Sequence, residues 1–187
     1  MRALVVYESM YGNTHAVATD IAAGLHTTHE VTLVPVTRAT PELVAAADLI
    51  VAGGPTHLHG MSTVASRRQA AEAARKPGSG LMLDADASGP GLRSWLERLN
   101  AEGVPAAAFD TRLAGLTVMT GRASRAIARV LTRRGCRVLV VPESFLIGGR
   151  QALLDGEAAR ACSWGALVGE AARAAHATSK RSSAERS

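Results

Sequence analysis

The residues with the clearest chemical potential form a polar turn close to the start of the chain. An apolar run of strand length, Ala3 to Tyr7, leads into it, and a helical pattern begins at about Asn13. The turn consists of Ser9, Met10, Tyr11, Gly12, Asn13 and Thr14. A strand, a tight turn and a helix N-terminus together favour anion binding, because the first helical amides lack carbonyl partners and the helix dipole attracts negative charge.

The composition of this turn restricts the kind of anion. A nucleoside-triphosphate loop needs a lysine followed by serine or threonine, and no lysine occurs here. A dinucleotide fingerprint needs three spaced glycines, and only Gly12 is present. The turn therefore predicts a neutral cradle for one terminal phosphate, or else an ordinary strand-to-helix connection with a capping hydroxyl.

The same six residues resemble the phosphate loop of flavodoxins, whose pattern is Ser/Thr-x-Ser/Thr/Tyr-Gly-Thr/Asn-Thr. The segment from Ser9 to Thr14 fits every defined position of that pattern. In flavodoxins the loop binds the ribityl phosphate of FMN. The resemblance covers about Met1 to Ala175 and implies that FMN is the cofactor of this chain.

A second loop follows an apolar run that predicts a buried strand, Asp48 to Gly54. The loop contains Pro55, Thr56, His57, Leu58, His59 and Gly60. It resembles the ring-binding loop of flavodoxin-like NAD(P)H:quinone reductases, with the spacing shifted by about one residue. The resemblance implies backbone contacts to the flavin, with the backbone close to the ring at the glycine. A plain strand-to-helix connection is the alternative. The two histidines lack a nearby carboxylate or cysteine, so we predict no metal site.

A third loop begins with Phe109, Asp110 and Thr111. It resembles the end of the fourth strand in flavodoxins, where an aromatic residue often stacks on the flavin. Phe109 is the only aromatic residue available here, and it fits the core equally well. Because offset stacking contributes about 0.5–1.5 kcal/mol, its loss would weaken FMN binding by about tenfold.

The rest of the chain alternates predicted strands and helices. Further strands are expected at 30–36, 104–111 and 137–142, and helices at 13–25, 41–47, 63–78, 92–99, 122–134 and from 157 onward. This alternation predicts an α/β fold with a doubly wound, five-stranded parallel sheet. By resemblance, the strand order is the flavodoxin-like 2-1-3-4-5, which brings the three loops to one edge of the sheet.

The length of the chain favours a single domain, residues 1–175, with a probable insertion at 63–91 and a disordered tail at 176–187. No signal peptide or membrane-length apolar run is visible. Cys136 and Cys162 form neither a disulfide framework nor a metal-binding spacing. We therefore expect a reduced, cytoplasmic protein without a membrane partner.

The charge of the chain departs from that of classical flavodoxins, which are acidic. Its net charge is +5 and its pI is about 10.0. Four arginines, Arg122, Arg125, Arg129 and Arg133, share one predicted helix face. Such a row suits an acidic redox partner protein, the phosphates of a nicotinamide cofactor, or simply a solvated face. We expect no specific nucleic-acid site.

Taken together, these features predict an FMN-binding, flavodoxin-like redox protein that carries one or two electrons on the flavin. An NAD(P)H-dependent quinone or flavin reductase is one alternative. A flavodoxin-fold binding or regulatory module with weak or no FMN binding is the other. No pair of residues in the sequence indicates a catalytic acid or base.

Overall fold

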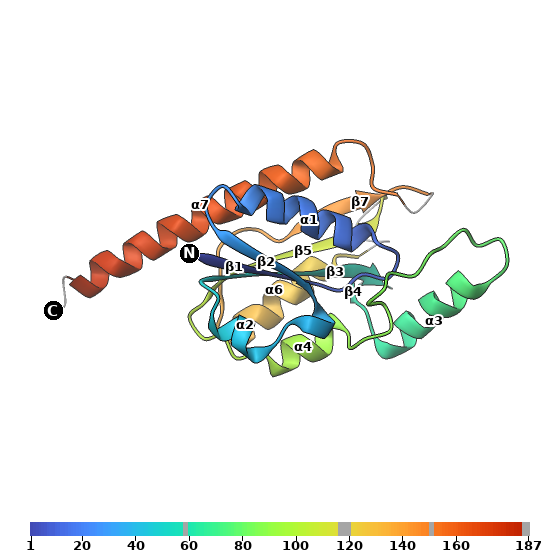
Figure 1. Ribbon diagram of the computed structural model, residues 1–187, viewed down its shortest axis with the longest axis horizontal. Coiled ribbons are helices and arrows are strands. Elements are labelled where there is room, and N and C mark those ends of the chain that lie inside the picture. Colours follow the sequence, from blue (N-terminus) through green and yellow to red (C-terminus); the bar gives the residue numbers. More distant parts are fainter. Residues whose placement is uncertain (58–59, 116–120, 150–151, 185–187) are drawn as a thin grey trace.

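The computed structural model describes residues 1–57, 60–115, 121–149 and 152–184. A parallel sheet lies between two layers of helices (Figure 1). One face is covered by α1 (Asn13–Leu25) and α7 (Glu157–Ala184). The other face carries α2 (Pro41–Ala45), α4 (Leu92–Arg98) and α6 (Ala123–Arg133), while α3 (Val64–Arg75) lies to one side of the sheet. A short 3-10 turn, η1 (Val36–Arg38), precedes α2.

The sheet confirms the predicted doubly wound topology. Its strands run in the order β2-β1-β3-β5-β6, and β7 also pairs with β5. The parallel strands are β1 (Arg2–Tyr7), β2 (Glu30–Pro35), β3 (Leu49–His57), β5 (Pro105–Leu113), β6 (Arg137–Val138) and β7 (Glu143–Ile147). A two-residue strand, β4 (Gly60–Met61), pairs antiparallel with the end of β3. The carboxyl ends of β1, β3 and β5 therefore meet at one edge, as the order 2-1-3-4-5 requires.

The last strand position differs in detail from the prediction. The sequence predicts one strand over 137–142, whereas β6 ends at Val138 and the chain rejoins β5 only at Glu143. Pro142 has no backbone N–H to donate to a ladder, which explains why the pairing is interrupted before it. The fifth position of the sheet is consequently shared by two short strands.

The core consists of two apolar clusters, one on each face of the sheet. Ala106, Ala107 and Ala108 of β5 are fully buried, although alanine is a poor strand former. Burial on both faces outweighs this weak propensity. On the neighbouring strand, a Cβ at Gly53 would lie 2.2 Å from the ring of Phe109, so only glycine fits beside that ring.

Two segments outside this core concern the predicted domain boundaries. Within the predicted insertion 63–91, α3 buries only Ser66, which forms a capping box with Thr63. That this segment is an insertion stays a prediction. Disorder is expected from residue 176, whereas over the described residues 176–184 the structure has the continuation of α7. Its sequence is rich in alanine and contains no proline, so no residue interrupts the helix.

Candidate functional site

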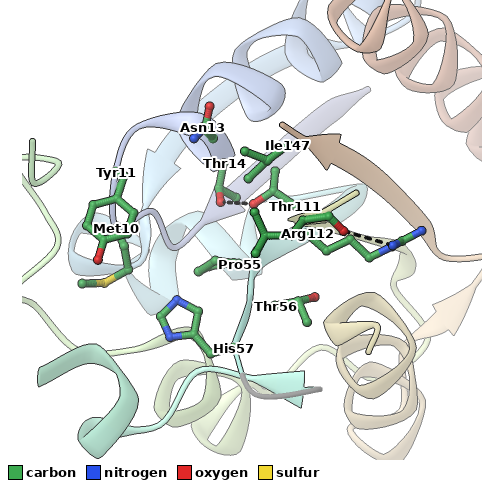
Figure 2. A pocket seen from close by; sticks show the side chains of 11 residues that line it. Met10, Tyr11, Asn13, Thr14, Pro55, Thr56, His57, Thr111, Arg112 and Ile147 are labelled. Atoms are coloured by element: carbon green, nitrogen blue, oxygen red, sulfur yellow. Dashed lines mark hydrogen bonds between the residues drawn. The ribbon is translucent and has the colours of Figure 1, made fainter. Parts of the chain in front are cut away.

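The three predicted loops converge on a cleft at the carboxyl edge of the sheet. Figure 2 shows its lining side chains, which come from the β1–α1 turn, the end of β3, the end of β5 and the end of β7. The cleft has a volume of about 170 Å³. It is lined by Met10, Tyr11, Asn13, Thr14, Pro55, Thr56, His57, Thr111, Arg112, Leu113 and Ile147.

The β1–α1 turn is built around Gly12, the N-cap residue of α1. Gly12 has a φ of +89°, a left-handed conformation that favours glycine. Its N–H donates to Ser9 Oγ at 3.0 Å, and its carbonyl accepts from Ala16 N at 2.9 Å. The first turn of α1 contains no acidic residue. The amides that begin the helix therefore present partial positive charge, and the nearby Asp84 carboxylate faces His15 Nδ1 at 3.6 Å.

Threonines join this turn to the end of β5. Thr14 Oγ1 and Thr111 Oγ1 lie 2.7 Å apart and form a hydrogen bond, drawn as a dashed line in Figure 2. Both side chains are almost fully buried. The bond fixes the spacing between the helix N-terminus and the far wall of the cleft.

The outer part of the turn is held by the 63–91 segment. Tyr11 donates its hydroxyl to the carbonyl of Ala70 in α3 at 2.9 Å, and Asp84 N–H donates to the carbonyl of Met10 at 2.9 Å. Burial raises the pKa of the Tyr11 phenol, so it stays protonated and keeps this donor. The 63–91 segment thus positions the turn although it packs little against the core.

The second wall is formed by Pro55, Thr56 and His57 at the end of β3. His57 Nδ1 lies 3.2 Å from Ser66 Oγ, which fixes the ring against α3. Burial lowers the pKa of His57; the nearby Glu8 carboxylate opposes this shift, and Arg67 adds to it. His57 is therefore a neutral imidazole at neutral pH.

Arg112 is a charged side chain in the wall that the sequence analysis does not propose as a site residue. It is 7% exposed, and its guanidinium donates to the carbonyls of Leu113 and Gly115. Figure 2 shows this group directed away from Met10 and Tyr11. The positive charge thus lies at the opposite end of the cleft from the polar turn.

Two predicted site residues at the end of β5 do not line the cleft. Phe109 is fully buried in the core, with its ring centroid 6.4 Å from that of Phe145 and 6.4 Å from that of Trp164. Its ring is therefore unavailable for stacking in the cleft, which corrects the expectation from sequence. The pleat directs this side chain into the layer of α1 and α7.

Asp110 has a structural role in this arrangement. It is fully buried and accepts a 2.6 Å hydrogen bond from Ser124 N–H at the start of α6. Thr56 Oγ1 accepts from Ala123 N at 2.9 Å, so the two side chains cap the same helix. Burial raises the pKa of Asp110, while hydrogen bonds from Ser124, Ser144 and Thr56 act in the opposite direction.

Three of the remaining predicted residues support the cleft without lining it. Ser9 and Gly12 shape the turn from behind, and Gly60 belongs to β4, paired with His57. Leu58 and His59 lie outside the described residues. Besides Arg112, the sequence analysis misses Leu113 and Ile147. The apolar run from Phe145 to Ile147 was a sequence signal for the strand that carries Ile147.

Sequence analysis also misses Glu8, a carboxylate buried directly behind the polar turn. It is 6% exposed and accepts hydrogen bonds from Ser62 Oγ at 2.5 Å and from Leu92 N, the first residue of α4, at 2.7 Å. Glu8 therefore joins three segments beneath the cleft. An acidic residue at the end of an otherwise apolar strand was the available signal.

Comparison with known families identifies the class of protein. The model of the flavodoxin family matches residues 5–118, more than half of the 187 residues. The chain belongs to the flavodoxin family. No curated protein matches it.

Solved structures show the same fold at low sequence identity. A flavodoxin from the domain Archaea has a TM-score of 0.65 and 20% identity over 92% of this chain and 99% of its own. Flavodoxin 2 from Bacillus cereus has a TM-score of 0.63 and 22% identity over 91% and 98%. A WrbA-like flavodoxin protein from Agrobacterium tumefaciens has a TM-score of 0.58 and 22% identity over 92% and 97%.

Membership of this family assigns FMN as the cofactor, and the β1–α1 turn fits its phosphate end. The open space beside Gly12, where an added Cβ would meet no atom within 4 Å, lies next to the first amides of α1, whose first turn contains no acidic residue. Among the described residues, no group of three or more His, Cys, Asp or Glu side chains is arranged to hold a metal ion. Over the same part of the chain, no helix has the length and apolar character needed to cross a bilayer.

Proposed function

We propose that this protein carries one or two electrons on a bound FMN and exchanges them with a redox partner protein. The observation that carries the proposal is the cleft itself, where an uncharged helix N-terminus faces loops from two further strand ends. Bound FMN supplies the redox chemistry, and the chain supplies binding and orientation.

The proposed roles divide the cleft into two parts. The turn from Ser9 to Thr14 holds the phosphate through amides and hydroxyls. The loop of Pro55, Thr56, His57, Leu58, His59 and Gly60 contacts the ring from one side, and Thr111 with Arg112 borders it from the other. Phe109 and Asp110 support the wall from within the core and from the start of α6.

The cleft measures about 170 Å³, which is smaller than the pockets of about 300–1,000 Å³ that usually hold drug-sized ligands. A flavin held here would therefore extend out of the cleft toward the protein surface, which suits electron exchange with a partner protein.

Two alternatives retain specific support. The pattern of residues 54–62 resembles that of quinone reductases, which favours an NAD(P)H-dependent reductase. The burial of Phe109 removes the expected stacking ring, which favours a binding or regulatory module with weak affinity for FMN. The experiments below separate these three functions.

The test begins with the visible spectrum and flavin fluorescence of the purified protein titrated with FMN and, in parallel, with riboflavin. Three charge-assisted hydrogen bonds of about 1.5 kcal/mol each would favour FMN over riboflavin by more than about 1,000-fold. A carrier should also accept electrons in a potentiometric titration and show little NADPH-dependent quinone turnover. Sustained turnover would instead identify the reductase, and FMN affinity weaker than micromolar would identify the module.

The proposal also covers partner and location. An acidic redox partner protein suits a chain of net charge +5. A cytoplasmic location is supported by Cys136 and Cys162, which are both free thiols.

A further inference from the structure

A second, larger groove lies between α6 and the segment that connects β6 to β7. Its volume is about 830 Å³. It is lined by Arg125, Ala128, Arg129, Thr132, Arg133, Val138 and Pro142. We call this surface the α6 groove.

Positive charge lines one side of the α6 groove. Arg125, Arg129 and Arg133 are all exposed and are spaced four residues apart on α6. No acidic residue in the described part of the chain lines the groove. Because like charges four residues apart destabilise a helix by about 0.2–0.5 kcal/mol per pair, this row opposes folding rather than assisting it. Only Arg133, in the last turn, interacts favourably with the helix dipole.

The floor of the groove is apolar. Ala128 is buried, and Val138 and Pro142 line the opposite side. Val141 is 79% exposed in the same connecting segment. Apolar contacts surrounded by charge are typical of protein docking surfaces, whereas a merely solvated face needs no exposed valine.

The amino end of α6 adjoins the wall of the cleft. The first residue of α6, Ala123, bonds to Thr56 in the cleft wall, and Ser124 bonds to Asp110 at the end of β5. From Arg125 to Arg133 the row extends about 12 Å along α6, at 1.5 Å per residue. The row therefore begins at Arg125, two residues after the helix start that is bonded to the cleft wall, and a protein bound along it lies next to that wall.

We infer that the α6 groove is the docking surface for the acidic face of the redox partner, with its carboxylates on the three arginines and apolar side chains on the floor. The inference rests on the proposed carrier function. It goes beyond it by assigning the partner to one helix, α6.

The test compares two charge reversals of equal size. Arg125→Glu/Arg129→Glu changes the groove, and Arg68→Glu/Arg75→Glu changes exposed arginines on α3. The FMN-loaded, reduced protein transfers one electron to plastocyanin, an acidic blue-copper protein in which Cu(II) becomes Cu(I). At low salt we expect the second-order rate constant to fall by about tenfold or more in the groove variant and by less than about twofold in the α3 variant.

A second measurement does not depend on FMN. Binding of poly-L-glutamate to the apoprotein should weaken by a similar factor in the groove variant alone, and thermal unfolding should show that both variants fold. If the protein fails to bind FMN, the carrier function is wrong, but this measurement still reports on the groove.

Equal losses in both variants, or none in either, would overturn the inference. A short DNA duplex that binds more tightly than poly-L-glutamate and loses the same factor would also overturn it, because the surface would then serve nucleic acid.

Discussion

Replacement of Gly12 by alanine tests the β1–α1 turn with little steric interference. An added Cβ would meet no atom within 4 Å, so the effect comes from the backbone conformation alone. Gly60→Ala is a matched control, because its Cβ also meets no atom within 4 Å and its φ lies outside the left-handed region. The pair separates conformational strain from added volume.

The expected magnitude follows from the φ of +89° at Gly12. A left-handed L-residue costs about 1–2 kcal/mol, and the reduced entropy of the unfolded chain offsets only part of this. Gly12→Ala should therefore lose about 1 kcal/mol of unfolding free energy, or about 2–4 °C in melting temperature for a domain of this size. Gly60→Ala should be neutral or slightly stabilising.

The functional effect should exceed the loss of stability. If the amides that follow Gly12 hold the phosphate, a shift of this turn should remove at least one charge-assisted hydrogen bond of about 1.5–3 kcal/mol, and FMN affinity should fall by about 10- to 100-fold. Affinity for riboflavin, which lacks the phosphate, should change little. The assays are urea unfolding of the apoprotein and fluorescence titration with both flavins. An FMN affinity in Gly12→Ala equal to that of the wild type would refute the assignment of the phosphate to this turn.

Three further predictions concern buried titratable groups. Glu8→Gln should lower the unfolding free energy by about 1–3 kcal/mol, because the charge-assisted bonds from Ser62 and Leu92 weaken. A double-mutant cycle with Ser62→Ala that shows additive losses would contradict this. Burial raises the pKa of Glu157, but hydrogen bonds from Arg160 and Leu146 N–H outweigh it and leave the pKa below the usual value. Glu157→Gln should therefore cost stability at neutral pH, and the difference from wild type should close as the pH falls below about 4.3. Because burial lowers the pKa of His57, its neutral form stabilises the fold above about pH 6.5, and that stability is lost as the pH falls further. His57→Gln should show a flatter profile below about pH 6.5, measured by urea unfolding.

The parts of the fold that sequence predicts well depend on local signals. The turn from Ser9 to Thr14 combines a strand end, a glycine and a helix start within a few residues, and the structure has all three. The continuous apolar run that ends at Gly54 predicts a central strand, and β3 is buried on both faces. Such features need no knowledge of distant contacts.

The role of Phe109 could not be decided in this way. A strand buried on both faces has no polar–apolar alternation, so its sequence does not indicate which layer each side chain enters. The decisive fact is the neighbouring strand, where Gly53 leaves room for the ring. That pairing of β3 with β5 joins residues 56 positions apart, as the register of Gly53 with Phe109 shows.

Long-range partners also explain why the sequence analysis does not identify Glu8 as a site residue. Its two hydrogen-bond donors lie 54 and 84 positions further along the chain. The break between β6 and β7, where Val138 and Pro142 line the α6 groove, contains a single proline in a run that otherwise favours a strand. In both cases the sequence contains the residue but not the contact that gives it a function.

The distribution of charge around the sheet edge connects the cleft with the α6 groove. The acceptors at the ends of β3 and β5, Thr56 and Asp110, are directed into the start of α6 rather than into the cleft. The carboxylate of Asp110 is thereby kept from an anionic ligand and stabilises the helix that carries the arginine row. Phosphate binding can then rely on backbone amides while the arginines stay available on the surface. An anionic cofactor and an acidic partner would therefore occupy neighbouring sites without competing for the same positive charges.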